Sequence, residues 1–469
     1  MSGPMALEPD GSAGDTLSLR LAEDRSRLGR LLGDDRTLAL RRPHWGADHA
    51  AVDELAAELA DRIGPAVHAY EVAALLESEG MSAEIIKERY GHPSLFSLAG
   101  ALYERVPRTF PEPARAADPW RPDHVRCALR GALFALPGLA YLLTGPLWHA
   151  ERSVSVLVVA GLISWAWGQA LGHRAFLRMT AGRREAARTL VKGAPLGAVV
   201  ATAAGSLVTG SGPAALAAGA QSVYLAAAGV LLVLGGERLL LAALTPMIAG
   251  AAVLPWWEPG NPLRAGLPLL SLLGAVAAAA WALRTALATT SAPGNSRLSL
   301  RRSLPYGLFG LAAGSLVLLT GRNQPYAVIV LTVSMGPAEW LLYRYRGLSV
   351  AALRATATPA AFRLRSAGIL VLCLCAYLLP LLPAALLTHS DPAPLLLLAA
   401  ALWTALLLQA FGAAWPPAGV CLVAAAAAGA LTLMDSLPVV EALSLCCGVA
   451  ALCLTACVLR LLGRPAPHA

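Results

Sequence analysis

From residue 126 onward, long apolar stretches alternate with short polar or basic segments. Because a helix needs about 20 mostly apolar residues to cross a bilayer, each stretch predicts one membrane span. The pattern therefore predicts an all-α polytopic membrane protein with about twelve transmembrane helices. The predicted spans lie near residues 126–148, 153–172, 193–210, 213–235, 238–256, 265–283, 304–320, 325–342, 366–388, 393–412, 416–435 and 438–461.

The first 125 residues show short amphipathic segments instead. The segment AVDELAAELADRIG has apolar residues at helical spacing and a stop signal at Gly64. Three more short helices are predicted over 69–79, 82–90 and 93–106, with Pro93 in the first turn of the last. Their apolar faces predict a small helical domain with one shared core. The expected core residues are Leu75, Leu76, Ile85, Ile86, Leu95, Phe96, Leu98 and Leu102.

The same pattern divides the chain into seven parts. We refer below to the helical domain before the membrane spans as the head, and to the two sets of six spans as the first half and the second half. The parts are a flexible N-terminal lead (1–30), a cytoplasmic helical domain (31–108), a Pro-rich linker (109–125), the first membrane half of six helices (126–283), a basic cytoplasmic linker (284–303), the second membrane half of six helices (304–462) and a cytoplasmic tail (463–469).

Charge separates the head from the membrane region. Residues 1–125 hold 21 of the 29 Asp and Glu but only 14 of the 37 Lys and Arg. Lys and Arg concentrate in the cytoplasmic loops of membrane proteins. With twelve spans and the N-terminus inside, 20 of the 23 basic residues that follow residue 125 fall on the cytoplasmic side. This distribution predicts a multi-pass protein of the cytoplasmic (inner) membrane with both termini in the cytoplasm.

Composition and motifs narrow the functional classes. The chain is 57% hydrophobic and 14% charged, against about 45–50% and 25% for soluble domains. The acidic head lacks the basic face that nucleic-acid binding requires. All eight cysteines fall in apolar runs without metal-ligand spacing, so neither a metal site nor a disulfide framework is expected. The predicted outward loops are short and carry no paired acids, and phosphate-loop and hydrolase motifs are absent, so neither an enzyme nor a cofactor is expected.

The two halves repeat a spaced polar pattern. In the second span of the first half, Ser164, Gln169 and Arg174 are five residues apart. In the second span of the second half, Ser334, Glu339 and Arg344 have the same spacing. In both halves a four-residue connection (HAER or GRNQ) precedes this span and a basic loop of about twenty residues follows it. Two six-helix halves of the same orientation are typical of transporters with a substrate path between the halves.

The segment RMTAGRREAARTLVKGAPLGAVVATAAG (178–205) carries a basic amphipathic stretch directly into an apolar helix. It resembles the segment that joins the second and third helices in polysaccharide and lipid-linked-oligosaccharide flippases, which belong to the multidrug/oligosaccharidyl-lipid/polysaccharide (MOP) exporter superfamily. The equivalent segment of the second half is RYRGLSVAALRATATPAAFRLRSAG (344–368). The resemblance covers residues 126–462, mostly in topology. It implies a flippase or exporter of a lipid-linked or anionic saccharide that works by alternating access between two six-helix bundles.

Two charges within the spans are the first candidate substrate-binding residues, because a charge in the bilayer core costs several kcal/mol unless it is paired or hydrated. Arg130 is predicted either to face a central cavity, where its guanidinium would bind a pyrophosphate bidentately, or to reach back to the headgroups. Glu339 is predicted either to report the gating state or bind a coupling ion, or to be an interfacial carboxylate paired with Arg344. The neighbouring Glu237 and Arg238 are interpreted as structural residues of a tight turn.

The remaining candidates are polar residues of the repeated pattern. Gln169 either lines a polar path or joins helices, and Arg174 and Arg344 either contact substrate or anchor the protein to anionic lipids at the cytoplasmic face.

Two alternative functions stay open. One is a small-molecule antiporter of the same superfamily, and the other is a membrane scaffold whose head recruits a protein partner. A wide cationic cavity would favour the flippase, a narrow cavity with a buried carboxylate the antiporter, and a cavity filled by apolar side chains the scaffold.

Overall fold

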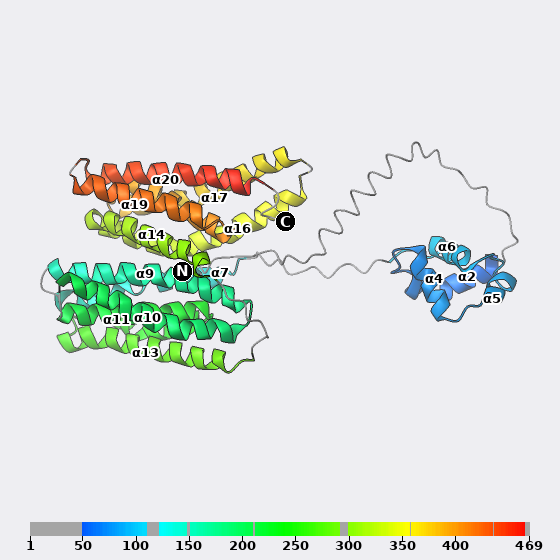
Figure 1. Ribbon diagram of the computed structural model, residues 1–469, viewed down its shortest axis with the longest axis horizontal. Coiled ribbons are helices and arrows are strands. Elements are labelled where there is room, and N and C mark those ends of the chain that lie inside the picture. Colours follow the sequence, from blue (N-terminus) through cyan, green and yellow to red (C-terminus); the bar gives the residue numbers. More distant parts are fainter. Residues whose placement is uncertain are drawn as a thin grey trace. The chain divides into compact units, whose positions relative to one another are not determined.

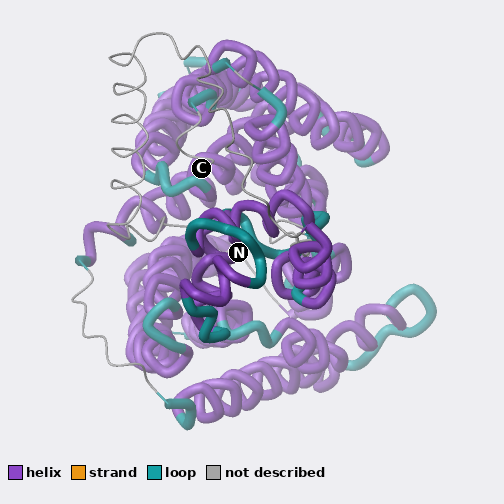
Figure 2. The backbone as a smooth tube through the Cα atoms, turned by 90° about the vertical axis from the view of Figure 1, so that its right-hand side faces the viewer, coloured by secondary structure: helices purple, strands orange, loops and turns teal. Residues whose placement is uncertain are grey.

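A computed structural model describes residues 49–109, 122–147, 151–209, 212–290, 299–356, 358–434 and 436–464. The chain divides into two compact units, one on each side of the predicted linker, and each is described by itself. The described residues form helices and contain no strand (Figures 1 and 2). The predicted lead (1–30), most of the Pro-rich linker (110–121), residues 291–298 of the basic linker and residues 465–469 of the tail lie outside the described residues.

The head contains the predicted short helices. Serine side chains begin two of them, because the hydroxyls of Ser82 and Ser94 accept hydrogen bonds from the backbone N–H groups of Ile85 and Ser97. Pro93 was predicted in the first turn of the last helix, but it precedes the Ser94 cap and lies outside the helix. The helices are α2 (His49–Glu58), α3 (Ala60–Ile63), α4 (Ala69–Ser78), α5 (Ala83–Glu88) and α6 (Leu95–Arg105).

The head has its own apolar core, which includes most of the expected residues. Leu76, Ile86, Leu98 and Leu102 are buried, and Leu75 and Leu95 pack against them. The prediction was wrong for Ile85 and Phe96, which are 44% and 63% exposed. Each is adjacent in sequence to a core-facing or core-flanking residue, and neighbouring positions on a helix point about 100° apart. A short helix can therefore bury only one of the two.

The membrane unit contains ten described helices that are long and apolar enough to cross a membrane. Helices α15 and α16, bent by 41° at Ser334, form an eleventh span if they are counted together. The remaining predicted span, 238–256, corresponds to α12, whose 17 residues are at the lower limit for a membrane helix. The helices are α7 (His124–Ala135), α8 (Gly138–Thr144), α9 (Glu151–Met179), α10 (Arg183–Thr209), α11 (Pro213–Val233), α12 (Glu237–Val253), α13 (Asn261–Leu287), α14 (Leu304–Asn323), α15 (Pro325–Val333), α16 (Met335–Arg354), α17 (Pro359–Leu387), α18 (Pro392–Ala410), α19 (Trp415–Leu433) and α20 (Val439–Leu462).

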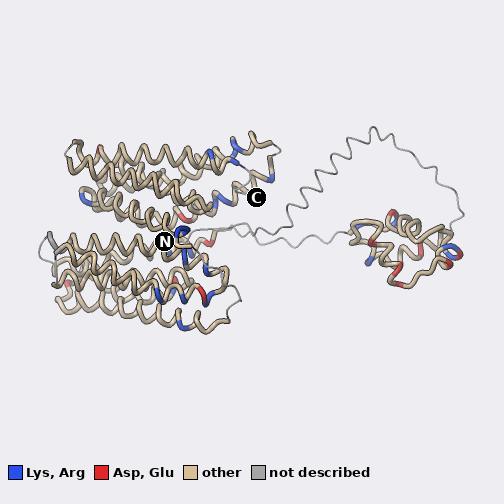
Figure 3. The backbone as a smooth tube through the Cα atoms, viewed as in Figure 1, with Lys and Arg blue, Asp and Glu red and all other residues tan. Residues whose placement is uncertain are grey.

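The basic segments after the second span of each half are helical, whereas loops of about twenty residues were predicted there. Helices α9 and α10 are separated only by residues 180–182, and α16 and α17 only by residues 355–358. Arg178 and Arg354 lie in the last turns of α9 and α16, and Arg183 and Arg184 lie in the first turn of α10. These helices extend past the apolar stretch because arginine is a good helix former. Lys and Arg gather at the end of the membrane unit where α7 begins and α9 ends (Figure 3). We call this the basic end.

The two halves share one packing pattern. In the first half α12 packs on α7 and α13, and α11 packs on α13; in the second half α19 packs on α14 and α20, and α18 packs on α20. The principal contacts between the halves are also equivalent, since α7 packs on α16 and α9 packs on α14. Each of these contacts joins the first span of one half to the second span of the other. Figure 1 shows α14, α16, α17, α19 and α20 on one side of this junction and α9, α10, α11 and α13 on the other.

The head core generates a first prediction. We expect Leu98→Ala to destabilise the head by about 2–5 kcal/mol, because it leaves a cavity among fully buried neighbours. Hydrogen–deuterium exchange of the full chain in nanodiscs should show faster exchange over residues 49–109. The matched control is Ile85→Ala, which removes an exposed aliphatic side chain and should leave that exchange nearly unchanged. Equal effects of the two substitutions would contradict this core.

Candidate functional site

A cavity of about 710 Å³ lies between the two halves of the membrane unit. Its walls come from α7, α8, α9 and α11 of the first half and from α14 to α18 of the second. Gly145, Val154 and Leu318 line it near the end of the helices opposite the basic end, and Met335 and Ala338 line it near Glu339. The cavity therefore extends from the opposite end of the bundle to the immediate neighbourhood of a buried carboxylate.

The cavity wall is mostly apolar and rich in aromatic rings. Phe134, Trp165, Tyr377 and Trp403 all line it. These four rings form two pairs that pack across helices. Phe134 meets Trp165 edge-on at 6.2 Å, and Tyr377 stacks with Trp403 at 6.3 Å between ring centroids. The first pair joins α7 to α9, and the second joins α17 to α18. Each half thus contributes one aromatic pair to the wall.

Few polar groups in the wall are free to bind a ligand. The hydroxyl of Tyr377 is hydrogen bonded to Ser334 Oγ at 3.0 Å, and that of Thr332 donates to the backbone of its own helix. Gln221 Nε2 donates to the Leu157 carbonyl at 3.3 Å, while its Oε1 has no hydrogen-bond partner among the described residues. Gln169 also lines the cavity, and its amide makes no hydrogen bond to another described residue. Two amides therefore offer hydrogen bonds in an apolar wall.

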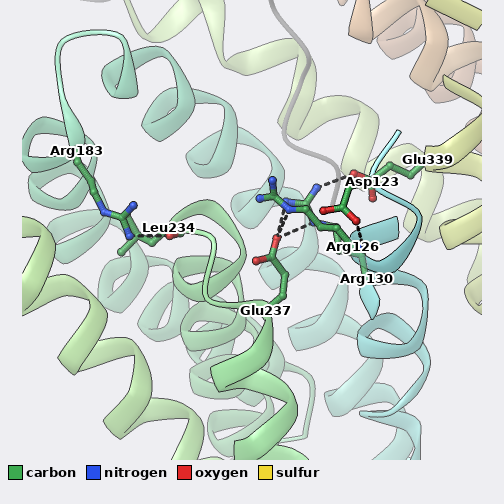
Figure 4. Close-up of polar contacts among 7 residues, drawn as sticks. All are labelled: Asp123, Arg126, Arg130, Arg183, Leu234, Glu237 and Glu339. Atoms are coloured by element: carbon green, nitrogen blue, oxygen red, sulfur yellow. Dashed lines mark hydrogen bonds and ion pairs between the residues drawn. The ribbon is translucent and has the colours of Figure 1, made fainter. Parts of the chain in front are cut away.

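A cluster of four charged residues joins the halves (Figure 4). It lies next to the end of the cavity nearest the basic end, which we call its inner limit, because Ala338, which precedes Glu339, lines the cavity there. Arg130 lies at the centre of the cluster and is only 9% exposed. Its Nη1 is 2.6 Å from Glu339 Oε1, and its Nη2 is 2.9 Å from Glu237 Oε1. Arg126 Nε adds a second contact to Glu237 Oε1 at 2.8 Å. Both glutamates are buried, so each carboxylate is compensated by an arginine.

Local sequence explains how the cluster forms. Arg126 and Arg130 are four residues apart on α7, so both project from the same face of that helix. The Asp123 carboxylate accepts a hydrogen bond from the Arg126 backbone N–H and begins the helix. Glu237 is the first residue of α12, directly after a turn in which Gly235 has a φ of +74°. Arg183 donates to the Leu234 carbonyl at 2.8 Å and ties the start of α10 to this turn (Figure 4).

Glycines let α7 and α16 approach closely next to the cluster. A Cβ atom on Gly131 would lie 2.9 Å from the backbone of Gly336, and one on Gly336 would lie 2.9 Å from the Cys127 carbonyl oxygen. The two backbones are therefore in direct contact at this point. This contact places Arg130 of one half within hydrogen-bond distance of Glu339 of the other.

Among the residues that the structure describes, no ion pair joins α9 to α14 in the equivalent contact. Gly307, Gly310 and Gly314 of α14 face Ala166, Gln169 and Leu162 of α9. Near the basic end, His173 stacks on Tyr306 with ring centroids 3.7 Å apart and lies 3.1 Å from Ser303 Oγ. The two equivalent contacts between the halves thus differ in chemistry, because one is ionic and the other is neutral.

The predicted site residues have different places in the structure. Gln169 lines the cavity, whereas Arg130 and Glu339 pair with each other and are not among the residues that line it. The predicted partner of Glu339, Arg344, is exposed and lies over the Trp340 ring at 5.6 Å. Arg174 is half-buried near the basic end, and its Nη1 has no hydrogen-bond partner among the described residues.

The sequence reasoning missed the role of Glu237. It was interpreted as part of a structural turn, but it compensates Arg126 and Arg130 within the first half. The scarcity of acids after residue 125 was a usable signal, because a buried arginine on α7 needs a carboxylate and few are present. No group of three or more His, Cys, Asp or Glu that could hold a metal occurs within the part of the chain that the structure describes.

Comparison with known proteins gives structural likeness only. No protein-family model and no curated protein matches the chain. Among solved structures, it is similar to a MATE transporter in complex with MaL6 (TM-score 0.42, 15% identity, 76% of this chain and 99% of the other). It is also similar to the outward-facing conformation of a multidrug resistance MATE family transporter of the MOP superfamily (TM-score 0.41, 14% identity, 74% and 97%). A third is a MOP superfamily transporter from Pyrococcus furiosus Vc1 (DSM3638) (TM-score 0.38, 14% identity, 75% and 100%).

The charged cluster generates a second prediction. We expect Arg130→Ala to destabilise the protein by about 3–5 kcal/mol, because Glu339 would remain buried without a partner. Adding Glu339→Gln should recover part of this loss, since the amide needs no compensating charge. The measurement is the thermal unfolding temperature of the purified chain in one detergent.

Arg126→Ala is the matched control, because this side chain is 48% exposed and Glu237 keeps its contact with Arg130. We expect a smaller loss for it. A double variant that is less stable than Arg130→Ala alone would show that the cluster does not hold the halves together as described.

Proposed function

We propose that the membrane unit transports a small apolar or amphipathic molecule by alternating access between its two halves. The observation that carries the proposal is the cavity between the halves, whose inner limit lies beside an ion pair that joins them. Such an arrangement suits a transporter closed at the basic end. Opening at that end would require separation of Arg130 from Glu339. We propose, from the distribution of arginine, that the basic end faces the cytoplasm.

The size and chemistry of the cavity support a small-molecule substrate. Pockets that bind such ligands measure about 300–1,000 Å³ and combine apolar or aromatic walls with a few polar groups. The present cavity has about 710 Å³, two aromatic pairs and two available amides. Gln169 and Gln221 are the residues that would orient a substrate within it. A cavity of this volume also speaks against a scaffold whose centre is filled by side chains.

Transport of a lipid-linked or anionic saccharide, which the resemblance implies, receives less support. Recognition of a pyrophosphate would use a guanidinium with two free N–H groups on one edge, because bidentate hydrogen bonding to phosphate takes two parallel N–H donors. The guanidinium of Arg130 is engaged by two carboxylates instead. The cavity therefore favours the small molecule, and the saccharide remains the alternative for the test to exclude.

The distribution of charged residues supports two further proposals about what the protein binds. We propose that the arginine-rich turns of α9, α10, α16 and α17 contact anionic lipid headgroups at the basic end. Acids are scarce around these arginines, since Glu185 is the only acid between residues 152 and 236 and Glu339 is the only acid between residues 303 and 390. The acidic head is proposed to recruit a protein partner.

Substitutions in the cavity generate a third prediction. Full-length protein in liposomes would be tested with ethidium, calcein acetoxymethyl ester and an NBD-labelled phosphatidylglycerol as probes. We expect uptake of at least one of the first two, and a drop of at least tenfold in Ala313→Trp, which fills the cavity. Gln169→Leu keeps the side-chain volume and should change the preference between the two dyes.

The matched control is Leu372→Trp, since Leu372 is 62% exposed on α17 and is not part of the cavity wall. Its uptake should match that of the unmodified protein. Movement of the labelled lipid without uptake of either dye would overturn the small-molecule proposal in favour of the flippase. Uptake of dye that Ala313→Trp leaves intact would show that this cavity is not the path.

A further inference from the structure

The head carries an aromatic surface that its own core does not use. Tyr70 of α4 and Phe96 of α6 are 68% and 63% exposed, and their rings meet edge-on with centroids 5.8 Å apart. Val67, which precedes α4, is 66% exposed, and its carbonyl oxygen accepts a hydrogen bond from the Tyr103 hydroxyl at 2.6 Å. Since α4 packs on α6 (Figure 1), these four residues form one surface, which we call the head patch.

The head patch contains a notch along α6. Phe96, Gly100 and Tyr103 follow one another at intervals of four and three residues, so they lie on one face of this helix. A Cβ atom on Gly100 would have nothing within 4 Å. The surface between the two rings is therefore open to an aliphatic side chain from outside. Contiguous exposed apolar residues of this kind mark a binding surface, and a groove between aromatic side chains suits the apolar face of a helix.

We infer that residues 17–32 of the same chain bind the head patch as an amphipathic helix. This segment belongs mostly to the predicted lead and lies outside the described residues. At 100° per residue, five of its leucines would fall within an arc of about 100°, which we call the leucine face. They are Leu17, Leu21, Leu28, Leu31 and Leu32. Leu19 would fall on the opposite side of the helix.

Net charge favours this segment as the occupant. Residues 49–109 hold ten Asp and Glu against five Lys and Arg, whereas residues 17–32 hold two acids against four Arg. Opposite net charges favour association of the two and suppress competing partners that are acidic. The surface of an anionic bilayer would be repelled by the head for the same reason. The segment is therefore a better occupant of the head patch than a membrane is.

Individual charges of the segment also suit the head patch. Arg20 and Arg25 would lie at the two borders of the leucine face, where they can contact acids of the head. Asp24 is the only charged residue within that face. The head patch has one cation of its own, since the guanidinium of Arg108 lies over the Tyr103 ring at 4.4 Å. Arg108 is thus the group that Asp24 would contact.

The connection to the head is long enough for the segment to reach the head patch. Helix α2 begins at His49, so residues 33–48 join the segment to the head. An extended chain of this length spans about 50 Å, whereas the radius of gyration of a domain of this size is roughly 10 Å. A connection of this kind also gives the segment an effective concentration on the order of millimolar.

Binding of the segment would regulate access to the head patch. A protein partner that uses the same surface must first displace residues 17–32. The apparent affinity for that partner is reduced by the fraction of molecules in which the surface is free. The inference concerns the head alone, so it stands or falls independently of transport by the membrane unit.

The test is hydrogen–deuterium exchange of the full chain in nanodiscs of phosphatidylcholine. We expect the backbone amides of residues 20–32 to exchange at least tenfold more slowly than those of an unstructured chain. Phe96→Asp places a carboxylate in the head patch, and Leu28→Asp places one in the leucine face. Each should abolish the protection of residues 20–32. Unchanged exchange over α2 would show that the head is still folded in both variants.

Two matched controls keep the chemistry of the substitutions and change their place. Leu19→Asp alters a leucine outside the leucine face, and Ile85→Asp alters an exposed residue of α5 outside the head patch. Both should retain the protection of residues 20–32. Loss of protection in either control to the same degree as in Phe96→Asp would contradict the proposed contact.

Three further outcomes would overturn the inference. The first is exchange of residues 20–32 at the rate of an unstructured chain in the unmodified protein. The second is protection that appears only when the nanodiscs contain phosphatidylglycerol and that survives Phe96→Asp, since the segment would then lie on the bilayer. The third is protection that disappears on tenfold dilution, which would mean that the head patch binds the segment of a second copy.

Discussion

The salt bridge between Arg130 and Glu339 is the interaction on which the membrane unit depends most. It is buried, it joins the two halves, and it lies beside the inner limit of the cavity between them. A buried ion pair contributes little net stability, because the cost of desolvating both charges opposes their attraction. Removing one partner is nevertheless strongly destabilising, because the other charge stays buried without compensation. The pair therefore matters less for what it adds when intact than for the cost of leaving either charge buried alone. Glu237 gives Arg130 a second carboxylate partner from within the first half.

The two halves show how one packing scheme can carry two chemistries. Equivalent helix pairs form both halves and both contacts between them. The repeated serine has a partner only in the second half, where Ser334 binds Tyr377. In the first half Ser164 has no hydrogen-bond partner among the described residues and lines a void of about 30 Å³. Such a void is large enough for a water molecule. The repeat therefore preserves the frame of the fold while the polar groups within it have diverged.

The sequence was sufficient for the architecture but not for the site. Apolar length predicted the membrane spans, and the helical spacing of apolar residues predicted the short helices of the head, because these signals are local. The Ser94 cap was not predicted, since Pro93 was placed inside that helix. The basic segments were predicted as loops, since charge obscures a helix that continues beyond the bilayer. The pairing of Arg130 with Glu339 joins residues 209 positions apart. Such a contact depends on how α7 and α16 meet, which no local pattern contains.

The backbone contact between Gly131 and Gly336 has a mechanical consequence. Elsewhere in a packed interior, side chains interlock, and separating two helices requires them to leave their rotamers one after another. At these glycines two smooth backbones meet with no side chain between them. Such a surface can part and close again without a change of rotamer at these two positions, while the direct backbone contact supplies van der Waals attraction in the closed state. At this junction the close backbone contact therefore lies beside two polar contacts between α7 and α16, which are the ion pair of Arg130 with Glu339 and the hydrogen bond that Trp340 Nε1 donates to His124.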